Sequence, residues 1–308
     1  MKACSSPQLW NEATFIRRAP AVALVLFAPA LPMRSSASDA NDDLIGNRFV
    51  EAGAPADVAL FGLPYDGAVI GRKGARLGPD AIRAELRKLK SDAPARWIDL
   101  GNADVPAETD PRAAGEIATR AMRAAMETHA FPVALGGDHS LTYGFVKAFH
   151  GPLAVLNIDA HLDLREAAFP NSGTSFRRLI DDKIAPAEWI TEVGIRPFAN
   201  SPKYLAWARA HGVRVHEELA LPELPAGARG LYVSLDIDVL DETAAPGVSA
   251  PTPGGPTTRE LYEYLGEVAR RYPVVALDVV ETCPPLDIDH KTARAAAWAI
   301  ATFVAARK

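Results

Sequence analysis

The sequence predicts an α/β fold in which helices cover both faces of a mostly parallel sheet. Three observations support this class. Short apolar runs alternate with helical patterns from about residue 55 to the end of the chain. Most of the apolar runs are continuous, as in parallel strands that are buried on both faces. Hydrophobic residues make up 48% of the 308 residues, enough for a sizeable ordered core.

Eight strands and six helices are expected in chain order. The strands are Val58–Leu63, Arg96–Leu100, Pro132–Leu135, Leu153–Asp159, Ile190–Ile195, Val213–His216, Leu231–Asp236 and Val274–Val280. The helices are Gly78–Lys90, Arg112–Thr128, Ser140–Phe149, Pro202–Ala210, Thr257–Arg271 and Thr292–Ala306. Pro79 suits a first helical turn, and Thr257 with Glu260 suits a helix start. The Pro/Gly-rich stretch Ala244–Pro256 is expected to be a long loop, and such loops are often functional.

The chain is expected to have two parts. Residues 1–45 are interpreted as a disordered or signal-like extension, and residues 46–308 as one catalytic domain. The stretch Ala19–Pro32 follows two arginines like the apolar part of a secretory signal, but its three prolines would break a helix. No apolar run reaches the roughly 18 residues of a membrane span. We therefore expect no membrane anchor and a cytoplasmic protein, with export as the alternative.

The composition excludes several classes of protein. The chain carries 33 Lys and Arg against 38 Asp and Glu, a net charge of -5, which argues against a nucleic-acid-binding surface. Its two cysteines, Cys4 and Cys283, are too few to stabilise a chain of this length by disulfide bonds, and they form no CxxC pair. Disulfide scaffolds and zinc fingers are therefore excluded.

Carboxylates and imidazoles follow four of the predicted strands, where parallel sheets bind their ligands. They are Asp138 and His139, then Asp159, His161 and Asp163, then Asp236 and Asp238, and finally Glu281. A spacing of two places alternate side chains on one side of an extended chain. Buried carboxylates would repel one another unless a divalent cation held them together. Four aspartates and two histidines exceed the usual ligands of one ion, so two ions are expected, and the oxygen-rich set favours Mn²⁺.

Three motifs resemble signatures of the ureohydrolase family, which includes arginase, agmatinase and formimidoylglutamase. They are Gly-Gly-Asp-His-Ser at 136–140, Asp-Ala-His-Leu-Asp at 159–163 and Ser-Leu-Asp-Ile-Asp-Val-Leu-Asp at 234–241. The resemblance runs from Phe61 through the final helix. It implies an arginase-like three-layer α/β/α sandwich, two Mn²⁺ ions per subunit and hydrolysis of a C–N bond in a guanidinium or amidine. A homo-oligomer, trimer or hexamer, is expected by analogy alone.

The resemblance also implies roles for individual residues. One ion would be held by His139, Asp159, Asp163 and Asp236, and the other by Asp159, His161, Asp236 and Asp238. A metal-bridging hydroxide would attack the substrate carbon. Asp163 would pass a proton to the leaving amine, and Glu281 would bind the amidinium or guanidinium.

The loop after the second motif favours formimidoylglutamase. In arginase and agmatinase this loop carries a histidine before Gly-Thr. Here Ser172 stands in the place of that histidine, before Gly173 and Thr174. Arg165 and Arg196 match formimidoylglutamase segments too, so we expect these five residues and Glu281 to bind substrate. Arg165 would pair with a substrate carboxylate, unless it pairs with Glu166 or Asp181.

Other functions are also compatible with parts of the sequence. Segments 61–66, 71–76 and 279–285 are closer to agmatinase or guanidino-acid hydrolases, so a ureohydrolase that releases urea is the alternative. A catalytically inert relative would have lost metal ligands, and none is missing. A phosphoesterase would order its ligands differently. The expected partner is a small amidine or guanidino compound.

Overall fold

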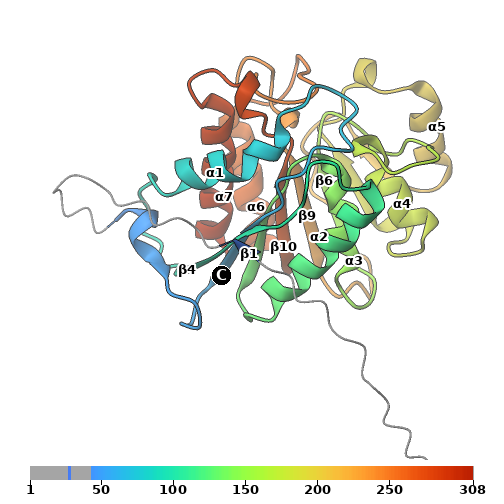
Figure 1. Cartoon of the computed structure of the whole chain (residues 1–308). Helices are drawn as coiled ribbons and strands as arrows, with labels where there is room; N and C mark the ends of the chain where they lie inside the picture. The colour runs from blue at the N-terminus through green and yellow to red at the C-terminus, as the bar shows by residue number, and fades with distance from the viewer. Residues whose placement is uncertain (1–26, 29–42, 308) are drawn as a thin grey trace, which may run out of the picture.

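The computed structural model describes residues 27–28 and 43–307. A ten-stranded sheet forms its centre, with the order β1-β4-β3-β5-β10-β9-β6-β7-β8 and with β2 also paired to β4 (Figure 1). The strands are β1 (Phe27–Ala28), β2 (Phe49–Val50), β3 (Val58–Gly62), β4 (Trp97–Ala103), β5 (Phe131–Leu135), β6 (Ala154–Ile158), β7 (Ile190–Val193), β8 (Arg214–His216), β9 (Leu231–Asp236) and β10 (Val274–Val280). All pairings are parallel except that of β1 with β4. The predicted mostly parallel sheet is confirmed.

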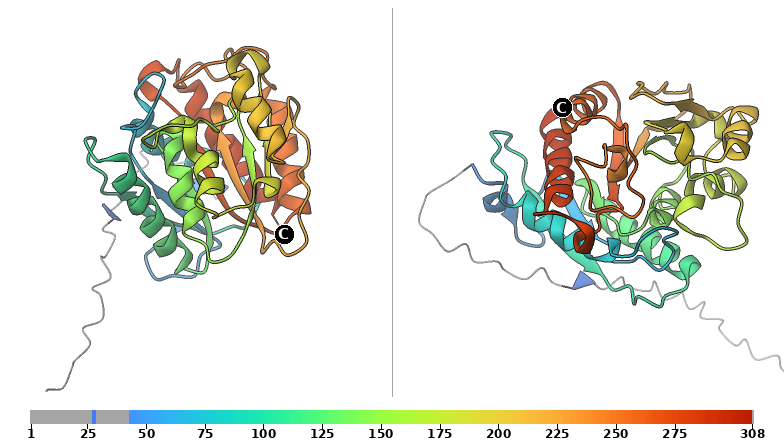
Figure 2. Two further views of the ribbon diagram at one scale, coloured as in Figure 1. Left: turned by 90° about the vertical axis from the view of Figure 1, so that its right-hand side faces the viewer. Right: turned by 90° about the horizontal axis from the view of Figure 1, so that it is seen from above.

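Helices cover both faces of this sheet (Figure 2). The α-helices are α1 (Gly78–Leu86), α2 (Pro111–Met126), α3 (Thr142–Lys147), α4 (Ser175–Asp181), α5 (Pro202–Ala210), α6 (Thr258–Arg271) and α7 (Lys291–Ala306). Short 3-10 helices are η1 (Ile45–Arg48), η2 (Ala75–Leu77), η3 (His139–Leu141), η4 (Ser172–Thr174), η5 (Ala187–Trp189), η6 (Pro197–Ala199), η7 (Ile237–Val239) and η8 (Pro284–Leu286). Helices α1, α6 and α7 pack on one face, and α2 to α5 supply buried side chains to the other. The three-layer α/β/α architecture is therefore confirmed.

Alternation along the strands divides the interior into two cores. In β3, Val58 and Leu60 belong to the core under α1, α6 and α7, whereas Ala59 and Phe61 belong to the core under α2 and α3. Each strand side chain points to the face opposite that of its neighbour, so a continuous apolar run satisfies both cores. This explains why these strands read as unbroken apolar runs in the sequence.

Most predicted element boundaries agree with the structure to within a few residues, with four differences. The two-residue strand β2 was not predicted, and with β1 it brings the eight expected strands to ten. The expected helix 140–149 is divided into η3 and α3. Helix α4 was not predicted. Strand β1 lies within the expected N-terminal extension, and the rest of the signal-like stretch lies outside the described residues.

Local signals for helix starts behave as expected. The Thr257 side chain accepts a hydrogen bond from the Glu260 amide, and the Glu260 side chain accepts one from the Thr257 amide. The two residues thus form a capping box at the start of α6. Pro79 lies in the first turn of α1. The stretch Ala244–Pro256 forms no helix or strand element. No helix in residues 43–307 is long and apolar enough to cross a bilayer.

The sheet order explains where the chemistry gathers. Strands β5, β10, β9 and β6 are consecutive neighbours at the centre of the sheet. They are the strands whose carboxyl ends lead into the four polar clusters of the sequence. Parallel strands present these ends at one edge of the sheet, so the clusters lie together.

Candidate metal centre and substrate cavity

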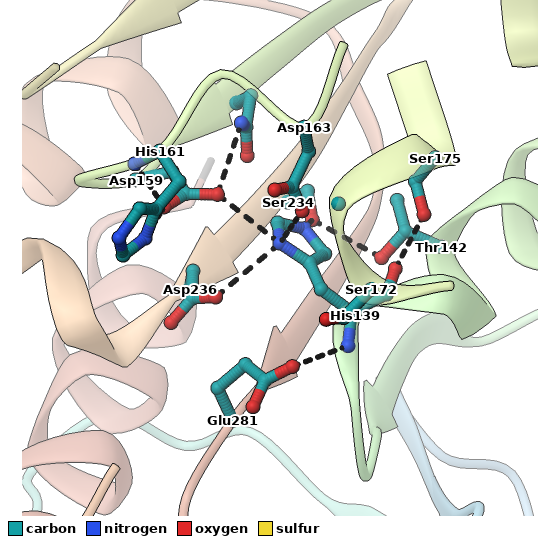
Figure 3. A network of polar contacts seen from close by, with 12 residues as sticks. His139, Thr142, Asp159, His161, Asp163, Ser172, Ser175, Ser234, Asp236 and Glu281 are labelled. Carbon is teal, nitrogen blue, oxygen red and sulfur yellow. Dashed lines mark hydrogen bonds and ion pairs between the residues drawn. The ribbon is translucent and has the colours of Figure 1, made fainter. Parts of the chain in front are cut away.

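Three of the predicted metal ligands surround an imidazole nitrogen of a fourth, His139 (Figure 3). The Nδ1 atom of His139 lies 3.0 Å from an oxygen of Asp163, 3.1 Å from Asp159 and 3.3 Å from Asp236. All four side chains are at most 9% exposed. This group comes from η3, the loop after β6 and the last residue of β9.

A second group lies beside the first. The Nδ1 atom of His161 is 3.1 Å from an oxygen of Asp238 and 3.4 Å from the second oxygen of Asp159. Two sets of mutually close ligand atoms result: His139, Asp159 and Asp236, and Asp159, His161 and Asp238. Asp159 belongs to both sets through its two oxygens. Such an arrangement suits a carboxylate that bridges two ions.

The local chain geometry differs from the extended path that the spacing suggests. Strand β6 ends at Ile158, so residues 159–163 form no strand, and Asp163 has a φ of 47°. Asp236 ends β9, whereas Asp238 lies in η7. Turns, rather than strand alternation, bring these side chains together. Asp163 adopts the left-handed region that favours glycine, and such strain in a non-glycine residue is typical of functional sites.

A buried hydrogen-bond network determines the orientation of His139. The carboxylate of Asp278 accepts from the hydroxyls of Ser234 at 2.7 Å, Tyr232 at 2.7 Å and Thr142 at 3.0 Å. Burial raises the pKa of Asp278, while the charge of His139 and these hydroxyls oppose the rise. Because Ser234 donates to Asp278, its oxygen accepts from Nε2 of His139 at 3.0 Å. A neutral imidazole, as a metal ligand requires, would therefore carry its hydrogen on Nε2.

This tautomer leaves Nδ1 of His139 available to bind a metal ion. Nδ1 of His139 is buried, has no recorded hydrogen-bond partner and lies 3.0–3.3 Å from oxygens of three carboxylates. Burial, followed by the charges of Asp238 and Asp159, raises the pKa of Asp236 well above its usual value. A divalent cation between the nitrogen and the oxygens removes this conflict. The donor set thus fits oxygen-preferring metal ions with some imidazole ligation.

Glu281 occupies the wall beside the cluster. Its backbone has a φ of 65° and its amide donates to the Gly137 carbonyl at 2.8 Å. One carboxylate oxygen accepts from the His139 amide at 2.8 Å, and the other is buried without a partner. Burial and then the charge of Asp138 raise the pKa of Glu281 to about 8. The side chain borders the cavity with this oxygen free for a cationic ligand, whose charge would lower that pKa.

The Gly-Gly turn before His139 needs its small residues. A Cβ at Gly137 would overlap the Tyr65 carbonyl oxygen, and a Cβ at Gly136 would lie 2.6 Å from a Val280 methyl. This close approach places the His139 segment against the end of β10, which carries Glu281. The motif is thus a packing requirement as well as a source of a ligand.

A cavity opens above the metal cluster. Its lining includes His139, His161, Asp163, Asp236, Asp238 and Glu281 on one side and Ile70, Arg165, Ser172, Gly173, Asn200, Ser201 and Tyr204 among the other residues. The Ser172 hydroxyl accepts from the Ile70 amide at 3.1 Å. Thr174 exchanges hydrogen bonds with Asn171 and is not among the lining residues. Four of the six expected substrate contacts therefore border the cavity: Arg165, Ser172, Gly173 and Glu281.

The two arginines of interest have different surroundings. Arg165 is exposed at the cavity, and its amide donates to the Gly173 carbonyl at 2.8 Å. Arg196 is 9% exposed, and its guanidinium donates to the carbonyls of Gly194 and Val239. Arg196 is not among the cavity-lining residues. Its position suits a role in holding the segments after β7 and β9 together.

Sequence reasoning missed the residues that support the ligands. Tyr232, Ser234 and Asp236 alternate along β9 with three apolar residues of the opposite core. Asp278 faces Ser234 across the β9–β10 pairing. This period-two polar stripe inside an apparently apolar run was the available signal.

Comparison with known proteins adds independent evidence. The family model described as "Arginase family" matches residues 56–305. A formimidoylglutamase of Halobacterium salinarum is 36% identical over 308 aligned positions, which cover 91% of this chain and 99% of that protein. The crystal structure of formimidoylglutamase from Bacillus subtilis matches with a TM-score of 0.83 and 30% identity, over 90% of this chain and 95% of that one.

The chain belongs to the arginase family. It is therefore a metal-dependent hydrolase of C–N bonds in linear amidines. Another member, Trypanosoma cruzi formiminoglutamase with Mn²⁺, matches at 25% identity with a TM-score of 0.76, over 86% of this chain and 99% of that one. The arginase-like fold expected from the three motifs is confirmed.

Proposed function

We propose that this arginase-family hydrolase converts N-formimidoyl-L-glutamate and water to L-glutamate and formamide. One observation carries the choice of substrate. Arg165 is the only lysine or arginine among the described residues that line the cavity, whereas Asp163, Asp236, Asp238 and Glu281 supply acids to its lining. An amidinium at one end and carboxylates at the other match this division of charge.

Arg165 is available for a ligand because its nearby acids have other partners. Glu166 pairs with Lys203 at 3.3 Å, and Asp181 pairs with Arg177 at 2.9 Å. Within residues 43–307 the structure records no ion pair for Arg165. A substrate carboxylate would supply the missing counter-charge, with a bidentate fork as the favoured geometry.

We assign the metal site to His139, Asp159, His161, Asp163, Asp236 and Asp238, with Mn²⁺ as the preferred ion because four of the six ligands are carboxylates. When bound, two such ions would lower the pKa of a water molecule and polarise the substrate. Asp159 would contact both ions with its two oxygens. The Ser234–Asp278 pair keeps the proton of His139 on Nε2, so that Nδ1 remains a ligand.

The acids in the cavity have separate tasks. The free oxygen of Glu281 accepts from the amidinium N–H groups and orients the planar carbon toward the metal cluster. Asp163 borders the same cavity and passes a proton to the departing glutamate nitrogen. The C–N bond to that nitrogen breaks, the water oxygen stays on the carbon as formamide, and the amine leaves as glutamate.

A guanidino acid that releases urea is the second candidate. The segment 71–76 favours it, and Gly71 borders the cavity. A guanidino acid such as 4-guanidinobutyrate keeps the carboxylate that Arg165 would bind. Agmatine carries a cationic tail that Arg165 would repel.

Product analysis of Mn²⁺-loaded protein tests the proposal. We expect formamide and glutamate from N-formimidoyl-L-glutamate, with a much larger kcat/KM than for urea release from 4-guanidinobutyrate or agmatine. Urea from 4-guanidinobutyrate without formamide from N-formimidoyl-L-glutamate would replace the proposal with the second candidate.

A further inference from the structure

The polar side chains of the cavity wall differ in whether they already have partners. Asn200 is fully engaged: its side-chain oxygen accepts from the Leu162 amide, and its nitrogen donates to Ala160 and Arg196 carbonyls, all at 2.9 Å. The Ser172 hydroxyl accepts from Ile70, and the Ser201 hydroxyl accepts from Lys203. These side chains hold the wall in place.

Tyr204 and Arg165 are different. Both border the cavity, and in the described part of the chain no hydrogen bond or ion pair is recorded for the Tyr204 hydroxyl or the Arg165 guanidinium. Tyr204 is half-buried in the first turn of α5, directly after the wall residues Ala199 to Ser201. Away from the candidate metal ligands and Glu281, the Tyr204 hydroxyl and the Arg165 guanidinium can therefore both donate a hydrogen bond to a ligand in the cavity.

Both residues are held on supported backbone. The Arg165 stem lies over Gly173, where an added Cβ would be 2.6 Å from Arg165 Cδ and 2.9 Å from an Ile70 methyl. Helix α5 starts at Pro202, directly after Ser201, whose hydroxyl caps the helix. Donors on supported backbone lose little entropy when they bind a ligand.

We propose that the Tyr204 hydroxyl donates a hydrogen bond to the acidic end of the substrate and, with Arg165, selects amidines with carboxylate tails. This inference rests on the proposed function and adds a specificity-determining residue to it. A cationic tail would meet the positive charge of Arg165 here, with the Tyr204 oxygen as the one acceptor of the pair. A carboxylate tail satisfies both, because a carboxylate accepts several hydrogen bonds.

The test compares Tyr204→Phe with the unchanged protein on two substrates. One is N-formimidoyl-L-glutamate, and the other is N-propylformamidine, which has the same head and no carboxylate. We expect KM for the acid to rise about tenfold to a hundredfold, as for the loss of a hydrogen bond to a charged group. We expect kcat for the acid and KM for the tail-less amidine to stay within about twofold, since only uniform binding is lost.

Tyr262→Phe is the matched control, because it removes a hydroxyl that bonds the Ala295 carbonyl on α7, outside the cavity. It is expected to leave both KM values unchanged. Equal effects of Tyr204→Phe on both substrates, or no effect on either, would overturn the inference.

A binding measurement separates this inference from the proposed reaction. L-glutamate, titrated into Mn²⁺-loaded protein by calorimetry, is expected to bind about tenfold or more weakly to Tyr204→Phe than to the unchanged protein. Equal binding, or no glutamate binding by either, would overturn the role of Tyr204. Failure of the proposed reaction instead shows as absent formamide in the product analysis.

Discussion

Ser234 and His139 form a hydrogen bond at the back of the proposed metal site, with the Ser234 oxygen 3.0 Å from Nε2 of the imidazole. Ser234 donates its own proton to Asp278 at 2.7 Å, so the direction of every bond in this chain is determined. This direction places the proton of a neutral imidazole on Nε2 and leaves Nδ1 to face Asp159, Asp163 and Asp236. Asp278 on β10 thus acts, through Ser234, on the proposed metal ligand His139 on η3.

Replacing Asp278 by asparagine should weaken metal binding without touching a ligand. An amide nitrogen at this position would donate to Ser234, which reverses the bond and favours the wrong tautomer of His139. We expect Mn²⁺ affinity to fall about tenfold to a hundredfold, measured by metal titration. Asp182→Asn, which disturbs the Tyr143 hydroxyl instead, is the control and should bind Mn²⁺ normally. Unchanged affinity in Asp278→Asn would contradict the relay.

Removal of the metal should destabilise the fold and the effect should depend on pH. Four carboxylates packed together repel one another once the cations leave. We expect chelation to lower Tm and Mn²⁺ to restore it, with Tm rising further as free Mn²⁺ increases. Protons compete for the same ligands, so more Mn²⁺ should be needed for half-saturation as the pH falls. A Tm insensitive to chelator and Mn²⁺ would contradict this expectation.

Glu281→Gln should separate substrate binding from metal binding. The amide oxygen still accepts from the His139 amide, while the charge that pairs with the amidinium is lost. We expect kcat/KM to fall at least a hundredfold, equivalent to about 2.7 kcal/mol or more. Bound Mn²⁺, measured by elemental analysis, should be unchanged. Full activity in this variant would remove Glu281 from the mechanism.

Arg165→Met should weaken binding of acidic substrates. The side chain keeps much of its apolar contact with Gly173 and loses the charge. We expect KM for N-formimidoyl-L-glutamate to rise about tenfold to a hundredfold with kcat little changed. Arg209→Met, on α5 outside the cavity, supplies the matched loss of charge. If both variants behaved alike, Arg165 would not be the counter-charge.

The helix start at α6 provides a test of local stability. Thr257→Ala removes the hydroxyl that caps the Glu260 amide at 3.3 Å, which typically costs about 0.5–2 kcal/mol. We expect denaturant unfolding to report this loss while kcat/KM stays the same. Thr258→Ala, one residue later, should have a smaller effect because it keeps the capping box.

The fold and the gathering of the proposed ligands could be predicted because both depend on local patterns. Continuous apolar runs mark doubly buried strands, and polar residues at their carboxyl ends mark the site. The turn at Asp163 could not be predicted, since its φ of 47° is imposed by surrounding structure. The roles of Ser234 and Asp278 could not be identified from the sequence, because each lies among apolar neighbours. Their pairing depends on the β9–β10 register.

Tertiary contacts explain the remaining differences. Tyr204 lies in an ordinary helical pattern, and its place on the cavity depends on how α5 packs beside the loop after β6. Arg196 lies beside cavity segments in the sequence, but two backbone carbonyls bind its guanidinium. The partner of a long flexible side chain is decided by such contacts rather than by its neighbours in the chain.

Crystals grown with Mn²⁺ should show two peaks of anomalous diffraction roughly 3.5–4 Å apart. One peak should contact Nδ1 of His139 and the other Nδ1 of His161, with Asp159 between them. Peaks elsewhere, or none among these side chains, would contradict the metal centre and the reaction assigned to it.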